Sequence, residues 1–314
     1  MSLITSRALR LAFAILATLL FAIILWLPKD SIRNVHDITL PARHSRISVN
    51  WSRSAYVQYV TNTAYLCNSV MIFEALHRFG SKADRLMMYP SGFSLDGTSV
   101  ESKLLRKAQG QYGVKLMPIQ VQSKEDRDST WAESYTKLLA FNQTQYDRVL
   151  SLDSDVTLLQ PMDELFLLPP CPVAMPRAYW LNFDDRVLTS LLMLVQPSDF
   201  DALVIPHRPY SMLTGEFRSK RHADYLGNPL ETWDPERAFE EAKLVHFSDW
   251  PVPKPWIQIP TSTMDEQKPT CDNNNQTAVE DCRARDIWLG LYSDFIKRRQ
   301  NICGMAAEET ANDH

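Results

Sequence analysis

Short apolar runs alternate with amphipathic segments along the first half of the chain. Four runs have the length and apolar content of buried strands, and they lie at 54–60, 84–90, 113–121 and 147–152. Between them, apolar residues recur every three or four positions, which predicts helices at 66–79, 101–109 and 131–141. Strands that alternate with helices predict an α/β fold with a mostly parallel sheet and helices on both of its faces.

The second half of the chain has shorter apolar runs. We expect strands at 172–175, 188–195 and 202–205, followed by a stretch rich in proline, tryptophan and charged residues. A final helix is predicted at 283–299, where an apolar residue recurs every four positions. We expect its apolar stripe to cover the sheet.

A long apolar run near the N-terminus differs from the rest of the chain. Residues 11–27 contain one polar residue, Thr18, and would span roughly 25 Å as a helix, enough for a thin bilayer. We predict a short cytoplasmic tail (1–10), a transmembrane signal anchor (11–27), a stem (28–50) and a lumenal domain (51–314). A cleaved signal peptide and a buried helix are the alternatives, and basic residues on both sides of the run do not decide its orientation.

Composition narrows the class of protein. With 314 residues, 45% of them hydrophobic, the chain can form one substantial core, and its net charge of −4 gives no support to a nucleic-acid partner. Sequons for N-glycosylation begin at Asn50, Asn142 and Asn275 and weakly support a lumenal location. In that oxidising environment we expect a disulfide among Cys271, Cys282 and Cys303, and the odd total of five cysteines leaves at least one unpaired.

Two aspartates end the strand predicted at 147–152. Asp153 and Asp155 are separated by Ser154, and apolar residues resume directly after them. Two carboxylates near a core repel each other and lose hydration unless a cation or hydrogen-bond donors compensate, so the pair suits Mg²⁺ or Mn²⁺. An aspartate turn or helix cap is the alternative. Asp126 and Asp128 have the same spacing in a polar segment without a preceding strand, where we expect a solvated loop.

Three segments resemble one enzyme family, in the same order along the chain. They are "YVQYVTNTAYLCNSVMIFEALHRFG", "YDRVLSLDSDVTLLQPMDELF" and "HFSDWPVPKPW". They are similar to the opening strand and T-N-x-x-Y loop, the D-x-D segment and the H-F-x-G-x-x-K-P-W element of glycosyltransferase family 8, the glycogenin-like enzymes. The third segment is two residues longer than usual. In this form, with "PHRPYSMLTGEF" before it, it resembles a fungal branch of Golgi N-acetylglucosaminyltransferases. The resemblance covers about residues 54–300 and implies a GT-A-type, Rossmann-like fold.

The resemblance implies roles for nine residues. The ligands of Mn²⁺ would be Asp153, Asp155 and His246. The residues that bind the UDP-sugar would be Thr61, Asn62 and Tyr65 at the uridine, Lys137 and Ser154 beside the acidic pair, and Lys254 at the diphosphate. A cation and a lysine on the diphosphate would stabilise the charge that grows on the leaving group. Each role has a structural alternative, such as a hydrogen-bonded histidine, a solvated lysine or a packed tyrosine.

Other polar and aromatic residues of the second half have two interpretations. His207, Arg208 and Glu216 could face the acceptor, although a structural loop is an equally good explanation. Trp250 and Trp256 could be core residues.

The chain departs from the family pattern in two places. Where the family has N-S-G before a strand, this chain has Thr189, Ser190 and Leu191, and a leucine in place of glycine should crowd a sugar that approaches the backbone. In addition, Phe200 runs directly into Asp201, where family members have a further segment and a D-Q or D-M pair near the transferred sugar. A skipped exon, a faulty gene model or an inactive paralogue would explain the loss.

The resemblance implies a function and a location. We expect a retaining, Mn²⁺-dependent enzyme in the Golgi membrane, with a single-pass type II topology, that transfers N-acetylglucosamine from UDP-N-acetylglucosamine to a mannose-containing glycan. The alternatives are a transferase that uses UDP-glucose or UDP-galactose, and an inactive paralogue that binds a nucleotide or a glycan. The sequence gives no indication of the oligomeric state.

Overall fold

The computed structural model describes residues 49–122, 133–181, 187–196, 203–273 and 280–308. The chain from Asn50 to His314 forms one compact unit. Within the described ranges, no helix has both the length and the apolar character to cross a membrane. The predicted tail, the predicted anchor and nearly all of the predicted stem lie outside these ranges, as do Asp126 and Asp128.

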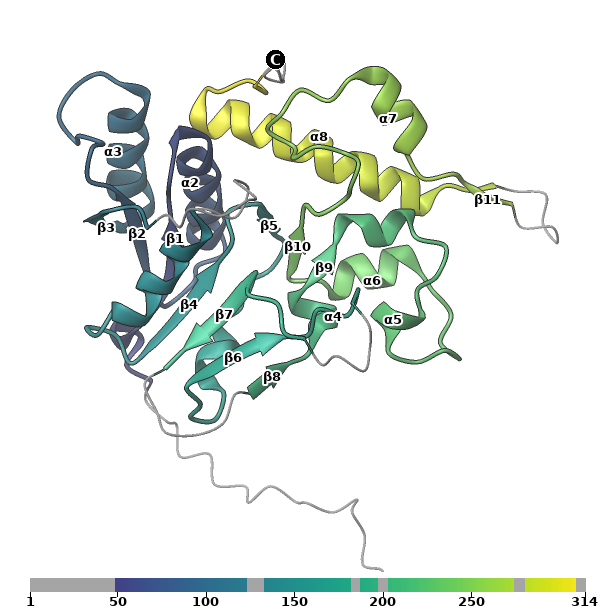
Figure 1. Cartoon of the computed structure of the whole chain (residues 1–314), viewed down its shortest axis with the longest axis horizontal. Coiled ribbons are helices and arrows are strands. Elements are labelled where there is room, and N and C mark those ends of the chain that lie inside the picture. Colours follow the sequence, from purple (N-terminus) through teal and green to yellow (C-terminus); the bar gives the residue numbers. More distant parts are fainter. Residues whose placement is uncertain (1–48, 123–132, 182–186, 197–202, 274–279, 309–314) are drawn as a thin grey trace, which may run out of the picture. The chain divides into compact units, whose positions relative to one another are not determined.

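A seven-stranded sheet forms the centre of the unit, in the order β3-β2-β1-β4-β7-β6-β8 (Figure 1). Its strands are β1 (Ser54–Tyr59), β2 (Asp84–Pro90), β3 (Val114–Ile119), β4 (Arg148–Leu152), β6 (Val173–Pro176), β7 (Leu192–Val195) and β8 (Leu203–Ile205). The first four strands are parallel, and β7 runs antiparallel to both of its neighbours. The prediction of a mostly parallel sheet is confirmed.

A second, three-stranded sheet was not predicted. In it, β10 (Leu244–His246) pairs antiparallel with β5 (Val156–Leu158) and parallel with β9 (Met212–Leu213). A small hairpin joins β11 (Asp272–Asn273) and β12 (Glu280–Asp281). Strands of two or three residues are too short to show a period of two, so the sequence pattern could not reveal them.

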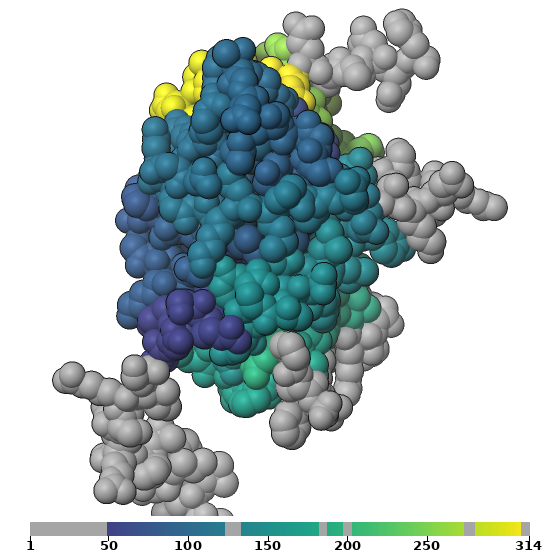
Figure 2. Space-filling view, turned by 90° about the vertical axis from the view of Figure 1, so that its left-hand side faces the viewer, coloured from purple at the N-terminus to yellow at the C-terminus, as the bar shows by residue number. Residues whose placement is uncertain are grey.

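Helices cover both faces of the large sheet, as predicted. The helices are α2 (Thr63–Arg78), α3 (Val100–Tyr112), α4 (His207–Tyr210), α5 (Ala223–Leu226), α6 (Pro235–Glu241), α7 (Thr261–Gln267) and α8 (Arg283–Cys303), with 3₁₀ turns η2 (Trp51–Arg53), η4 (Ser134–Asn142), η5 (Asp163–Leu167) and η7 (Thr214–Arg218). Alternate strand residues enter two cores, so that Tyr56 packs on the side of α2 and α3 while Val57 packs on the side of η4. Figure 2 shows the face built mainly by the first half of the chain, from purple to teal.

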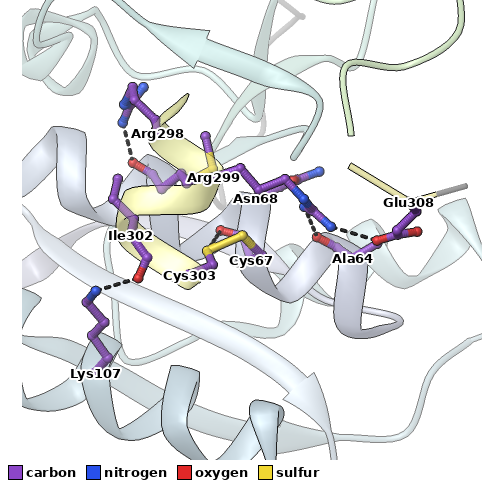
Figure 3. Close-up of a disulfide and its surroundings, with 10 residues drawn as sticks. Ala64, Cys67, Asn68, Lys107, Arg298, Arg299, Ile302, Cys303 and Glu308 are labelled. Atoms are coloured by element: carbon purple, nitrogen blue, oxygen red, sulfur yellow. Dashed lines mark hydrogen bonds and ion pairs between the residues drawn. A yellow bond between two sulfur atoms is a disulfide. The ribbon is translucent and has the colours of Figure 1, made fainter. Parts of the chain in front are cut away.

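The last helix differs from its prediction. Helix α8 is longer than the range 283–299 and packs mainly against α2, α6 and η7, so the expectation that it covers the sheet itself was wrong. Its fully buried residues include Arg299, which donates hydrogen bonds to Asn68 Oδ1 and the Ala64 carbonyl and forms an ion pair with Glu308 (Figure 3). Helix α8 therefore ties the C-terminal segment to the first turns of α2.

The cysteine pairing answers an open question of the sequence. Cys271 pairs with Cys282, as one of the expected combinations, whereas Cys303 at the end of α8 pairs with Cys67 in α2. Cys171 is buried and unpaired. We expected a disulfide among the three C-terminal cysteines and did not predict the longer bridge. A pairing of residues 236 positions apart depends on how two helices pack.

Candidate active site

Asp153 and Asp155 lie where the chain leaves the large sheet and enters the small one. Asp153 directly follows β4, and Asp155 directly precedes β5. The backbone of each is held by a different segment, because the Asp153 N–H donates to the Leu191 carbonyl at 2.8 Å and the Phe247 N–H donates to the Asp155 carbonyl at 2.9 Å. Ser154, between them, is buried. The paired carboxylates therefore occupy a fixed junction and not a free turn.

His246 reaches the acidic pair through strand pairing. It is the last residue of β10 and lies opposite Val156 of β5, which places its Nε2 atom 3.0 Å from Asp155 Oδ2. Its other ring nitrogen, Nδ1, is buried and has no hydrogen-bond partner within the described residues. One potential ligand atom from each of Asp153, Asp155 and His246 can be chosen so that all lie within 4.8 Å of one another.

These three residues fit a divalent cation. Two carboxylates and an imidazole form a donor set that suits Mn²⁺, and a buried ring nitrogen without a partner carries a desolvation cost that a ligand would remove. The structure thus brings together the three side chains that the resemblance assigns to the metal.

Two lysines contact the carboxylates, one on each. Lys137, on η4, places Nζ 2.8 Å from Asp153 Oδ1 and 3.1 Å from Ser190 Oγ. Lys254 places Nζ 2.7 Å from Asp155 Oδ2 and also donates to the Phe247 carbonyl. Both predicted lysines therefore lie at the acidic pair, where their positive charge can also face an anionic ligand.

The two aspartates differ in the direction of their pKa shifts. Burial raises the pKa of Asp153, and the attraction of Lys137 only partly opposes it. Burial acts on Asp155 too, but the contacts with His246 and Lys254 outweigh it and hold the pKa of Asp155 well below its usual range. Burial and the two nearby carboxylates raise the pKa of Tyr59, so this tyrosine is a neutral hydroxyl group beside the pair.

The predicted nucleotide loop, Thr61 to Tyr65, forms the start of α2. Asn62 is the N-cap residue, and its Oδ1 accepts a hydrogen bond from the Tyr65 N–H at 3.1 Å. Thr61 Oγ1 is buried and has no partner within the described residues. The Tyr65 ring packs edge-on against Trp256 at 5.5 Å between centroids, and its pKa is raised by burial and by Asp155. The loop thus borders the acidic site, and its contact with a nucleotide stays a prediction.

The cap at Asn62 yields a test that separates its structural role from its role in binding. Asn62→Ala should lower the free energy of unfolding by about 1 kcal/mol, because the first turn of α2 loses its cap. Asn62→Asp keeps a capping oxygen and should retain nearly full stability, yet it adds negative charge beside the site. Urea unfolding and UDP titration of both variants provide the measurement. Equal UDP affinity in Asn62→Asp and the unmodified protein would contradict a role near the nucleotide.

The other candidate residues have partners within the protein. Arg208 forms ion pairs with Glu231 and Glu241, and His207 Nε2 lies 2.6 Å from the Tyr225 carbonyl. Glu216 Oε1 lies 2.7 Å from His222 Nδ1. These contacts favour the structural interpretation of His207, Arg208 and Glu216.

Segment 189–191, which departs from the family pattern, supports the site. Leu191 is buried in the core and offers its carbonyl to Asp153, while Ser190 contacts Lys137. The sequence reasoning missed Ser190 and Tyr59 as neighbours of the acidic pair. Tyr59 ends β1, the strand beside β4, so the order of the strands was the signal that could have found it.

Comparison with solved structures shows the fold. The bifunctional glycosyltransferase WbbM, solved in its apo form, shares the fold with a TM-score of 0.50 at 12% identity, over 81% of this chain and 50% of that one. The likeness is one of fold: both chains have a mixed α/β architecture, and in this chain a pair of carboxylates follows β4. No family model matches the sequence.

Relatives among curated fungal proteins show the family. Glucose N-acetyltransferase 1 of Gibberella zeae is 51% identical over 290 aligned positions, and that of Aspergillus fumigatus is 44% identical over 311. These alignments cover 81% and 84% of this chain, and 63% and 81% of the relatives. The chain belongs to the glucose N-acetyltransferase 1 family.

The alignments also bear on the apparent gap after Phe200. The chain spans 63% of the length of the Gibberella zeae relative. The alignment has 290 positions but includes only 81% of the 314 residues of this chain, which is fewer than 290 residues. Some positions of that relative therefore have no counterpart inside the aligned part of this chain. This agrees with a missing internal segment, although residues 197–202, where the sequence places it, lie outside the described ranges.

Proposed function

We propose that this chain is a metal-dependent, retaining glycosyltransferase that transfers N-acetylglucosamine from UDP-N-acetylglucosamine to a mannose-containing glycan. The observation that carries the proposal is the cluster of Asp153, Asp155 and His246, with Lys137 and Lys254 on its two carboxylates. It combines hard anionic oxygens for a divalent cation with positive charges for a diphosphate.

The residues of the site suggest how the leaving group would be held. A bound Mn²⁺ would act as a Lewis acid that stabilises negative charge on the diphosphate. Lys137 and Lys254 can exchange their carboxylate partners for diphosphate oxygens and so favour the departure of UDP. The neutral hydroxyl group of Tyr59 can donate a hydrogen bond to the same anion. No side chain is assigned as a nucleophile.

The choice of sugar rests on the relatives. Their name, glucose N-acetyltransferase, refers to glucose and to an N-acetyl group, and N-acetylglucosamine is the derivative of glucose that carries an N-acetyl group at C2. The site itself contains side chains that suit the diphosphate of a nucleoside diphosphate sugar. This favours transfer of the whole sugar over transfer of an acetyl group.

The proposed location is the Golgi membrane, with the globular unit in the lumen. The apolar run at 11–27 provides the single-pass, type II anchor of this proposal. The disulfides Cys67–Cys303 and Cys271–Cys282 suit an oxidising compartment, and the sequon asparagines Asn50 and Asn142 are exposed. Asn275 lies outside the described residues.

The alternative is a paralogue that binds a nucleotide or a glycan without turnover. It is motivated by the aligned positions of the Gibberella zeae relative that have no counterpart in this chain. In this alternative the acidic site is retained, and the segment that the resembled family has near the transferred sugar is missing.

The decisive experiment uses the full chain in detergent. We expect UDP release that requires Mn²⁺, stops with a chelator and is fastest with UDP-N-acetylglucosamine in a panel that includes UDP-glucose and UDP-galactose. Addition of mannose oligosaccharides should increase the release and yield a longer glycan. Tight binding of UDP without release from any donor would instead support the non-catalytic alternative.

A further inference from the structure

We propose that Trp250 forms a stacking site for a sugar ring of the acceptor glycan, next to the acidic site. This inference rests on the proposed function and adds the residue that would receive the acceptor. A sugar ring has one face made mostly of C–H groups, and these are attracted to the electron-rich face of an indole.

The exposure of Trp250 is the first observation. Its relative exposure is 92%, whereas the nearby Trp256 is 5% exposed and Trp288 is fully buried. No ring contact within the described residues involves Trp250. An indole exposed to water lacks the favourable free energy that tryptophan usually gains from burial. A ligand that covers the ring would supply it.

Hydrogen bonds and an ion pair fix the backbone of the loop that carries Trp250. Asp249 is buried, forms an ion pair with Arg218 and accepts a hydrogen bond from Trp288 Nε1. The Val252 N–H donates to the Asp249 carbonyl at 2.8 Å, which closes the turn around Trp250. A Cβ atom at Gly215 would lie 3.2 Å from the Ser248 carbonyl oxygen, so the glycine allows η7 to approach this loop closely. The indole is therefore exposed while its backbone is fixed.

The loop begins and ends at the acidic site. Trp250 lies four residues after His246 and four residues before Lys254, and both of these contact Asp155. Four residues span at most about 14 Å, so the backbone of Trp250 lies within that distance of both. An acceptor of a few sugar units can cover such a distance. The two ends of the loop serve the metal and the diphosphate, which leaves its apex for the acceptor.

The surroundings of Trp250 favour a sugar over a protein partner. Ser248 is polar and exposed, Val252 is buried, and Pro251 directly after Trp250 is exposed, so the exposed apolar surface at this turn is one indole ring and one proline. A stable protein interface usually buries well over 1,000 Å² in total. One aromatic face is sufficient for one sugar ring.

The test separates acceptor binding from donor chemistry in the full chain. Trp250→Ala should raise the KM for mannose oligosaccharides at least tenfold and leave Mn²⁺-dependent UDP release in the absence of acceptor unchanged. Trp250→Phe, which keeps an aromatic face, should recover much of the affinity. Leu230→Ala is the matched control, because Leu230 is 91% exposed but lies outside this loop, and its KM should not change.

A binding measurement keeps the inference testable without turnover. The chain has eight tryptophans, and the difference in fluorescence between the unmodified protein and Trp250→Phe reports on Trp250. Mannose oligosaccharides should change this difference. They should also protect the fluorescence of Trp250 from quenching by acrylamide. An unchanged acceptor KM in Trp250→Ala, or no effect of the oligosaccharides on this fluorescence, would overturn the inference. Protection by oligosaccharides in a protein that turns over no donor would sustain it while rejecting the proposed function.

Discussion

Replacing Asp155 by alanine should abolish Mn²⁺-dependent UDP release from the donor. Asp155 contacts both His246 and Lys254, and these contacts keep its carboxylate ionised. The variant would lose a metal ligand and leave two basic side chains without their shared anion. Removing one group that stabilises charge in a transition state typically costs a factor of about 10² to 10³, and a metal ligand should cost at least that much. Steady-state UDP release and Mn²⁺ titration measure the effect.

A matched acidic pair provides the control for this experiment. Asp126→Ala removes an aspartate from the same D-x-D spacing in a polar segment, and we expect it to keep full activity. Asp153→Ala should behave like Asp155→Ala, because both belong to the predicted metal site. Equal loss of activity in Asp126→Ala and Asp155→Ala would reject the assignment of the site.

Loss of the Cys67–Cys303 disulfide should destabilise the protein by about 2–5 kcal/mol. The bridge joins α2 to the end of α8 across a sequence separation of 236 residues (Figure 3), so its removal frees a very long loop in the unfolded chain. The double variant Cys67→Ala/Cys303→Ala should show this loss in the free energy of unfolding, measured with urea. Because α2 begins at the predicted nucleotide loop, UDP affinity should also fall.

The second disulfide is the control for loop length. Cys271 and Cys282 are separated by 11 residues, and chain entropy predicts that Cys271→Ala/Cys282→Ala costs about 2–3 kcal/mol less than removal of the long bridge. The UDP affinity of this variant should be unchanged. If the short bridge proved to be worth as much as the long one, the stabilisation would have to come from local packing and not from the constraint on α2 and α8.

Some features of the fold could be predicted because neighbouring residues encode them. The strands at 54–60 and 84–90 and the helix at 66–79 appear close to their expected ranges. A strand in a sheet that is covered on both faces is a short, nearly continuous apolar run, and a helix packed on a core has apolar residues with a period of about 3.6. The segment at 131–141 was predicted as a helix, and its described part forms the 3₁₀ helix η4. Its residues contribute a buried face, which the pattern detects, but the type of helix depends on packing.

Other features could not be predicted because distant segments create them. The strand that carries His246 has three residues, and nothing in its local pattern indicates that it pairs with β5. Asn62 resembles a ligand-binding residue in its motif, while the structure also makes it the cap of α2. Trp250 and Trp256 are six positions apart and looked alike as core residues, yet Trp256 is buried and Trp250 is exposed.

The sequence alone determined that strands alternate with helices and that a buried strand ends in Asp153 and Asp155, because the hydrophobic pattern and two charges one residue apart are local properties. The tertiary structure decided what surrounds that pair. The antiparallel pairing of β10 with β5 brings His246 to Asp155, and the packing of η4 and of the loop after β10 brings Lys137 and Lys254 to the two carboxylates. These contacts join residues 16 to 99 positions apart, and only the folded backbone fixes such distances.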